Sequence, residues 1–191
     1  MITIVSCSHY PDDERIYHKE IKTLAEKRYS INYFTLSESE QNLSDENINH
    51  INYSSAKHSI KDYMYLVELE IRATSTRVIH IHEPELFSLA VNIKKLTGAK
   101  IIYDVHEDYI SMIYTFSKWN KYIKYLKAKY WLLKEKYFLQ HVDEVIIASS
   151  TIVNSDFKIQ GFSPVLLENF PSNKLVGDID FKHKKKNSLI Y

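Results

Sequence analysis

The sequence predicts an α/β protein with a doubly wound parallel sheet and three α/β/α layers. Short β-branched runs begin at Ile2, Val78, Ile101 and Val145, and segments with helical periodicity separate them. Strands that alternate with helices imply crossover connections, which place the strands parallel in one sheet. In addition, each of these runs ends in polar residues, so the polar groups should share one edge of the sheet.

The first half of the chain supplies four expected elements after strand Ile2–Val5. Tyr17, Ile21 and Leu24 recur at helical spacing, so we expect a helix that Asp12 or Asp13 caps and that ends near Arg28. Ile31–Leu36 reads as a strand, and the polar stretch Ser37–Asn49 as a surface loop. A short strand near Ile51 and a helix over Asp62–Ala73 follow.

The second half contains the best-marked helix, in which Pro84 suits the first turn and Gly98 the end. Strands Lys100–Tyr103 and Glu144–Ala148 flank one long expected helix, Ser117–His141. Val165–Leu167 reads as a last strand.

Composition limits the function classes. The 191 residues carry a net charge of +1 and suit one domain with a short extension. We see neither a secretory signal nor an apolar run long enough to span a membrane, and the single Cys7 fits a reducing compartment, so we expect a cytoplasmic location. With only three glycines, the chain has no Gly-rich phosphate-binding loop after its first strand.

The polar groups at the strand ends form the candidate site, because ligands bind at the carboxyl ends of parallel strands. His9 follows the first strand, His82 and Glu83 the Val78 strand, and Asp104, His106 and Glu107 the Ile101 strand. Since a carboxylate beside an imidazole tunes it for proton transfer, His106 near Asp104 is a candidate acid, base or oxyanion stabiliser. The alternative is a solvated turn. Glu83 and Glu85 could instead favour the positive end of the Pro84 helix.

Two other interpretations of this edge remain open. His80, His82 and His106 could hold zinc, but the sequence offers no fourth ligand, so we expect neither a metal nor a cofactor. Arg15 stands in the first turn of a helix, which is unfavourable for a cation and suggests an anionic partner such as phosphate. A salt bridge to Asp12 or Glu14 explains Arg15 equally well.

The Ser117–Gln140 segment holds seven lysines and one glutamate, with an apolar stripe that includes Trp119, Tyr122, Leu126 and Tyr130. A Lys-rich helix with aromatic residues fits docking on anionic lipid, with Lys121, Lys124, Lys127 and Trp131 toward the membrane. The alternative is a core-packed helix with a solvated basic face. Nucleic acid ranks third, and we do not expect it as a partner.

Five motifs, in order, resemble the N-terminal half of the family-4 retaining glycosyltransferases. They are Ser8-His9 with Asp12, Arg15-Ile16 and Lys19-Glu20; His80-x-His82-Glu-Pro-Glu-Leu86; Thr97-Gly98 through Tyr103-Asp-Val-His-Glu107; Glu168-Asn-Phe-Pro171; and Leu189-Ile-Tyr191. The resemblance implies one of the two facing Rossmann-like halves of a GT-B fold.

The same resemblance implies roles for the residues. His106 matches the family's active-site histidine, and His9, Asp12 and Arg15 would face the donor phosphates or the acceptor. We add His82, Glu83, Asp104 and Glu107 as substrate-binding candidates. The complete enzyme would move a hexose from a nucleotide-sugar, held by a second half, to a lipid-linked surface polysaccharide, and would work in the cytoplasm on the inner face of the membrane.

We accordingly divide the chain into a Rossmann-like acceptor-side domain over 1–171, a linker over 172–187 and the start of a donor-binding domain over 188–191. On this division we expect the isolated chain to be inactive. The competing hypothesis is a non-catalytic Rossmann-like binding module, or one subunit of a split transferase, that holds an acceptor, a membrane or a partner.

Overall fold

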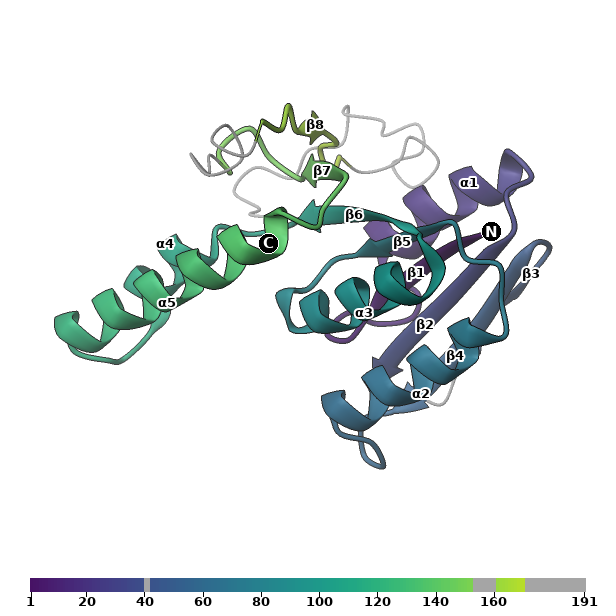
Figure 1. Cartoon of the computed structure of the whole chain (residues 1–191), viewed down its shortest axis with the longest axis horizontal. Helices are drawn as coiled ribbons and strands as arrows, with labels where there is room; N and C mark the ends of the chain where they lie inside the picture. Colours follow the sequence, from purple (N-terminus) through teal and green to yellow (C-terminus); the bar gives the residue numbers. More distant parts are fainter. Residues whose placement is uncertain (40–41, 153–160, 171–191) are drawn as a thin grey trace, which may run out of the picture.

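The computed structural model describes residues 1–39, 42–152 and 161–170, which form one eight-stranded sheet (Figure 1). The strand order is β3-β4-β2-β1-β5-β6-β7-β8, and every neighbouring pair is parallel except the antiparallel β3–β4. The strands are β1 Ile2–Ser6, β2 Ile31–Ser37, β3 Ser44–Asp45, β4 Ile48–Ser54, β5 Val78–Ile81, β6 Lys100–Val105, β7 Glu144–Ile147 and β8 Val165–Leu166.

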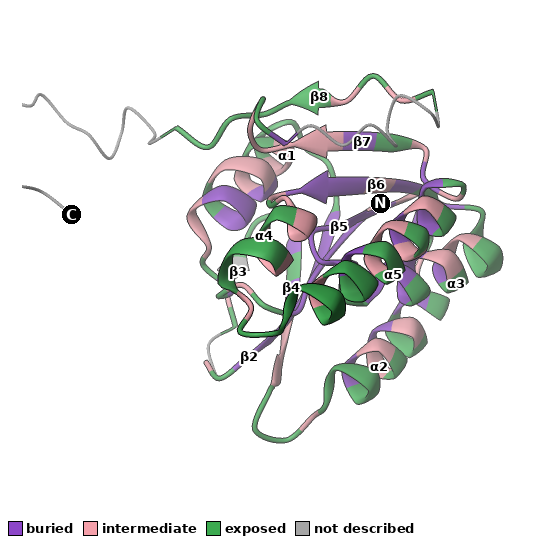
Figure 2. Cartoon of the chain, turned by 90° about the vertical axis from the view of Figure 1, so that its left-hand side faces the viewer, coloured by how far each residue is buried: buried purple, intermediate pink, exposed green. Residues whose placement is uncertain are grey.

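Helices cover both faces of the sheet, which confirms the predicted doubly wound, Rossmann-like fold (Figure 2). The helices are the π-helix η1 Glu14–Ile21, α1 Lys22–Glu26, α2 Ile60–Arg72, the 3₁₀ turn η2 Pro84–Leu86, α3 Phe87–Thr97, α4 Tyr109–Phe116 and α5 Lys121–Leu139. The larger core packs α2, α3 and α5 against one face, and the smaller core packs η1 against the other.

Strand alternation decides which residues face η1. Ile81 and Tyr103 point into the larger core, as does Ile79. Successive side chains on a strand point to opposite faces, so His80 and Asp104 point toward the η1 side. This alternation brings polar side chains of β5 and β6 to the face that η1 covers.

The helix ends follow the expected chemistry. Ser59 and Asp62 form a capping box at α2, and Gly98 ends α3 in the left-handed conformation at φ 73°. The Asn120 side chain accepts hydrogen bonds from the amides of Tyr122 and Ile123 at the start of α5. Caps of this kind satisfy amides that a helix leaves without an intrahelical partner.

Three expected elements were wrong in detail. The first helix starts as a π-helix, capped by Asp13, and is α-helical only from Lys22. Part of the expected loop Ser37–Asn49 pairs as β3 and the start of β4, because antiparallel pairing joins Asp45 to Ile48. The expected single helix Ser117–His141 is preceded by a separate α4, which begins where Asp108 caps the amide of Ser111.

The expected linker over 172–187 and the strand over 188–191 lie outside the described residues, as does Pro171. The division into domains therefore stays a prediction. None of the helices in the described part of the chain has the length and apolar composition needed to cross a bilayer.

Candidate functional site

The carboxyl ends of β1, β5, β6 and β7 lie side by side, because these strands are consecutive neighbours in the sheet. The predicted edge therefore exists. His9 and His106 meet there with ring centroids 5.2 Å apart, and both are partly exposed. Asp12 and Glu107 are exposed, and Asp12 lies in the loop between β1 and η1.

Glu83 is a buried anchor for the loop after β1. Its Oε1 atom accepts hydrogen bonds from Ser6 Oγ at 2.7 Å, from the Cys7 and Ser8 amides at 3.1 Å each, and from Ser8 Oγ at 3.0 Å. The Glu83 side chain makes no capping hydrogen bond to η2, so the expected role at the helix terminus is replaced by one that shapes the β1 loop.

Burial raises the pKa of the Cys7 thiol far above its usual value, which keeps the thiol protonated.

Arg15 is buried, and it pairs with neither of the acids that the sequence suggested. Its Nη2 atom donates to Asp104 Oδ1 at 3.0 Å and to Oδ2 at 2.9 Å, and its Nε atom lies 3.1 Å from Glu20 Oε1. Its Nη1 atom donates to the Leu167 carbonyl. Arg15 thus joins β6, η1 and the segment after β8, and its guanidinium is engaged within the protein rather than directed at a ligand.

The π-helix explains the contact between Arg15 and Glu20. These residues are five positions apart, which would separate them around an ordinary α-helix. In a π-helix the hydrogen bonds run from i to i+5, as from the His18 amide to the Asp13 carbonyl at 3.3 Å, so residues five apart lie above one another. Helical periodicity in the sequence gave no sign of this winding, and Glu20 was missed as a site residue for that reason.

His82, Asp104 and His106 form a connected group. His106 Nε2 lies 3.1 Å from His82 Nδ1 and 3.3 Å from Asp104 Oδ2. His106 retains 14% side-chain exposure, whereas His82 and Asp104 have none. His82, a substrate-binding candidate from the sequence, is therefore buried beside Glu20 of η1, and His106 is the exposed end of the group.

The charges in this group depend on burial. Burial opposes ionisation of Asp104, but its hydrogen bond with His106 and the neighbouring imidazoles hold its pKa well below the usual range. Burial, together with the charge of Asp104, raises the pKa of Glu20 well above its usual range. Burial lowers the pKa of His80 to about 4 and holds that of His82 well below its usual value, which favours the neutral form of both imidazoles.

A separate pair supports the β1 loop. His9 Nδ1 lies 3.3 Å from Asp13 Oδ2, and the hydrogen bond raises the pKa of His9 although burial opposes it. Asp13 also accepts hydrogen bonds from the Arg15 and Ile16 amides at 2.9 Å each. The cap of η1 and the position of His9 therefore depend on one carboxylate.

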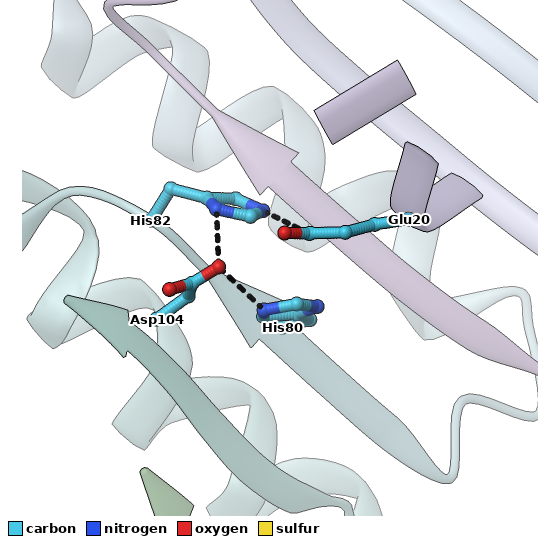
Figure 3. A group of neighbouring side chains, drawn as sticks. All are labelled: Glu20, His80, His82 and Asp104. Atoms are coloured by element: carbon cyan, nitrogen blue, oxygen red, sulfur yellow. Dashed lines mark ion pairs between the residues drawn. The ribbon is translucent and has the colours of Figure 1, made fainter. Parts of the chain in front are cut away.

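Four of the buried groups could bind a cation (Figure 3). Glu20, His80, His82 and Asp104 each offer an atom within 4.8 Å of the others, and the figure shows them pointing toward one another from η1, β5 and β6. This set differs from the histidine triad considered from the sequence, since it replaces His106 with two carboxylates.

The Lys-rich segment exposes its apolar stripe. Tyr122, Leu126 and Tyr130 are 70%, 63% and 67% exposed, and α5 packs inward through Ala128, Phe138 and Leu139. The interpretation of the stripe as packed core is therefore wrong. Trp131 was expected to face a membrane. Instead it is half-buried, and its ring packs against that of Tyr109 with centroids 4.8 Å apart.

The Asn-aromatic segment after β8 is tied to η1. Lys19 Nζ donates to Asn169 Oδ1 at 2.7 Å and to the Phe170 carbonyl at 2.6 Å. With the bond from Arg15 to Leu167, these contacts hold the last described segment beside the candidate site.

Comparison with known proteins supports the fold. No protein-family model matches the chain, and no curated protein sequence matches it significantly. Among solved structures, it is similar to the sucrose-phosphate synthase of Thermosynechococcus elongatus (TM-score 0.65, 12% identity, 92% of this chain and 50% of that one). A shorter chain of that synthase matches with a TM-score of 0.59 and 11% identity, over 91% of this chain and 92% of that one.

A third similar structure is Os79 from O. sativa, in complex with UDP and deoxynivalenol-3-glucoside (TM-score 0.50, 10% identity, 87% of this chain and 52% of that one). The chain spans about half the length of the synthase and of Os79. At these identities the likeness concerns the fold alone. The chain has an α/β Rossmann-like fold whose structural neighbours are GT-B glycosyltransferases.

Proposed function

We propose that this chain is the acceptor-side part of a retaining glycosyltransferase that transfers a hexose from a nucleotide-sugar. The observation that carries the proposal is a partly exposed imidazole, His106, at the carboxyl edge of a sheet whose fold resembles GT-B glycosyltransferases. Ligands bind at this edge in open α/β sheets. His9 and the exposed Asp12 and Glu107 contribute further polar groups to the same edge.

The contacts of His106 determine what it can do. Asp104 can only accept a hydrogen bond when ionised, and His106 Nε2 lies beside both Asp104 Oδ2 and His82 Nδ1. In the tautomer with the proton on Nε2, Nδ1 of His106 is an acceptor. His106 is placed to accept a hydrogen bond or a proton from a sugar hydroxyl, and Asp104 and His82 act as positioning residues.

The donor would bind to a second domain, across the edge of the sheet that carries His106. The contacts of Lys19 and Arg15 with the segment 167–170 would fix the point at which the chain leaves this domain. Catalysis would depend on positioning of the two substrates and on electrostatic stabilisation of the leaving phosphate. The division at 171, 172–187 and 188–191 is part of this proposal.

The first experiment reads the coding sequence beyond Tyr191 and assays its full product for release of nucleoside diphosphate from labelled nucleotide-sugars. We expect an in-frame second domain of roughly 100–150 residues, a product of retained anomeric configuration, and a loss of about 100-fold or more in kcat for His106→Ala. His18→Ala, which removes an exposed histidine of η1, is the matched control. Wild-type turnover by His106→Ala would overturn the role of His106.

A split enzyme is the second candidate, favoured if the coding sequence stops at Tyr191. The chain should then recover a separately encoded donor-binding protein in a pull-down, and the reconstituted pair should transfer sugar while this chain alone does not. Sugar transfer by this chain alone would contradict both candidates.

The aromatic–lysine surface would hold a lipid-linked acceptor near the membrane. We use this name for the exposed side chains of α4, α5 and the turn between them: Tyr114, Phe116, Lys118, Trp119, Lys121, Tyr122, Tyr125, Leu126, Lys127, Lys129, Tyr130, Leu133 and Tyr137. Figure 1 shows these helices extending beyond the edge of the sheet. Aromatic side chains interleaved with lysines suit an interface with anionic lipid.

Vesicle co-sedimentation tests this surface. We expect binding to vesicles that contain an anionic lipid and weaker binding to neutral vesicles. Binding should be lost when Lys121, Lys127 and the half-buried Lys124, which donates to the Tyr114 carbonyl beside the surface, become Glu. The control replaces three other lysines of the described surface, Lys57, Lys61 and Lys95, by Glu, since it changes the net charge equally. Equal loss in both triple variants would show a general charge effect and contradict the surface.

A further inference from the structure

We infer that Glu20, His80, His82 and Asp104 form a structural binding site for a divalent transition-metal ion of the zinc class. The four side chains come from η1, from β5 and the residue that follows it, and from β6, and their ligand atoms lie within 4.8 Å of one another. The site shares His82 and Asp104 with the group that positions His106, but the inference does not depend on the proposed reaction.

The strongest observation is a set of buried polar atoms without hydrogen bonds. Among the described residues, His80 Nε2, His82 Nε2 and both carboxylate oxygens of Glu20 have no hydrogen-bond partner. The side chains of His80 and His82 are 7% and 0% exposed, and both nitrogens lie on the side of the carboxylates. Buried polar atoms are normally satisfied, and Arg15 Nε lies 3.1 Å from Glu20 Oε1, so among the described residues the atoms left for a bound ion are His80 Nε2, His82 Nε2 and Glu20 Oε2.

The distances fit a site that contracts onto an ion. His82 Nε2 lies 3.9 Å from Glu20 Oε2, His80 Nε2 lies 3.9 Å from Asp104 Oδ2, and Figure 3 shows both contacts. Zinc binds nitrogen and oxygen at about 2.0–2.2 Å, so tetrahedral ligand atoms lie about 3.4 Å apart. The ligand atoms would move inward by about 1 Å or less, which side-chain rotation supplies.

The contacts of Arg15 leave one carboxylate oxygen of Glu20 for the ion. The Nε atom of Arg15 contacts Glu20 Oε1. The guanidinium pairs with Asp104, while Glu20 Oε2 faces His82 rather than Arg15. Arg15 and His106 each contact the carboxylate of Asp104, one of the proposed ligands. Contacts of this kind from groups that do not bind the metal orient its ligands.

The chemistry of the ligands selects the ion. Two imidazole nitrogens beside two carboxylates favour zinc and similar first-row ions over magnesium and calcium, which prefer oxygen alone. A cavity of about 360 Å³ between η1, β6 and the segment after β8 adjoins the site, and its lining includes Arg15, Glu20, Leu24, His80, Ile102 and Leu167.

The experiment measures metal binding by the whole 191-residue chain. After incubation with zinc and removal of free ion, elemental analysis should find about one zinc per chain, and Co²⁺ should give the visible absorption of tetrahedral nitrogen and oxygen coordination. Glu20→Gln and His80→Gln should each lower zinc affinity by about 100-fold or more, a loss at least as large as outer-contact mutations cause. Asp104 is left unchanged because it also pairs with Arg15.

The controls separate this site from surface histidines and from unfolding. The double variant His18→Gln with Glu26→Gln removes an exposed histidine and an exposed acid of the same helical segment and should bind zinc as the wild type does. Zinc should raise the melting temperature of the wild type and of this control, measured against chelator, and should leave that of Glu20→Gln unchanged. Less than stoichiometric zinc in the wild type, or equal zinc in Glu20→Gln, would overturn the site and leave a hydrated polar pocket.

Discussion

Ionisable side chains are abundant both at the edge of the sheet near β5 and β6 and on the aromatic–lysine surface of α4 and α5. They are mostly buried at the edge of the sheet and mostly exposed on the two helices. At the edge, Arg15, Asp104 and His82 are buried and contact one another. On α5 Glu135 is buried, but lysines such as Lys121 and Lys127 and aromatic rings such as Tyr122 are exposed. Composition alone therefore does not indicate which cluster of polar side chains is buried.

The physical difference lies in which neighbours each region has. Residues of β5 and β6 alternate between two faces, and η1 covers one of them, so polar side chains there must pair. In contrast, α5 packs through the Ala128 and Phe138 side and leaves the rest to solvent. The two regions should therefore respond very differently to the same kind of substitution.

The largest effect should come from Asp104→Ala. The variant leaves the Arg15 guanidinium buried without its main partner, and breaking a buried ion pair in this way costs about 3–5 kcal/mol of the free energy of unfolding. Lys121→Ala on α5 should change it by less than about 0.5 kcal/mol. Urea denaturation of both variants measures the contrast, and a similar cost for the two would contradict it.

The helix caps sharpen the comparison, since each region has one. Asp13→Ala should cost about 1–2 kcal/mol, because the carboxylate caps two amides of η1 and contacts His9. Asn120→Ala, which removes an exposed cap of α5, should cost about 1 kcal/mol or less. A larger cost for Asn120→Ala in the same denaturation assay would show that the exposed cap is the more important one.

Lowering the pH should remove the contribution of Asp13 to the free energy of unfolding over a defined pH range. Burial opposes ionisation of Asp13, but the hydrogen bonds from His9 and from the Ile16 amide lower its pKa from 3.8 to about 2. A depressed carboxyl pKa stabilises the fold above the unfolded value, so this contribution is complete above about pH 4 and is lost as the pH falls through 2. The loss should be smaller than the full cost of Asp13→Ala.

The measurement compares unfolding free energies of the wild type and Asp13→Asn between pH 5 and about 2. The difference between the two proteins should shrink as the pH falls. If it stays constant over that range, Asp13 does not titrate with a depressed pKa.

The smallest effect on stability should come from the aromatic–lysine surface. Leu126→Ser and Tyr130→Ser should each change the free energy of unfolding by less than about 0.5 kcal/mol, because both side chains are mostly exposed. Leu139→Ala on the same helix should cost about 2–5 kcal/mol, since Leu139 is 1% exposed. Thermal unfolding of the three variants tests this order, and a large loss in Leu126→Ser would mean that the surface is covered.

Much of the fold could be predicted from the sequence, because local patterns encode it. The β-branched runs, Pro84 and Gly98 mark strands and a helix that the structure contains, and alternation gives the parallel sheet. The helix α4 was missed because its cap Asp108 lies in the polar group at the end of β6, which was interpreted as part of the site rather than as the start of a helix.

The candidate site could be predicted only in part. The motifs placed His106 near Asp104, which the structure confirms at 3.3 Å. The burial of His82 and the partners of Arg15 depend on how η1 packs on the sheet, and no short sequence pattern carries that information.

The sequence by itself determined the element order, the parallel sheet and the edge where polar groups gather, because periodicity and strand ends are local properties. Only the tertiary structure decided that Glu20 joins His80, His82 and Asp104. That contact requires the π-helical winding of η1 and its packing across β5 and β6, and both arise from interactions between residues far apart in the chain.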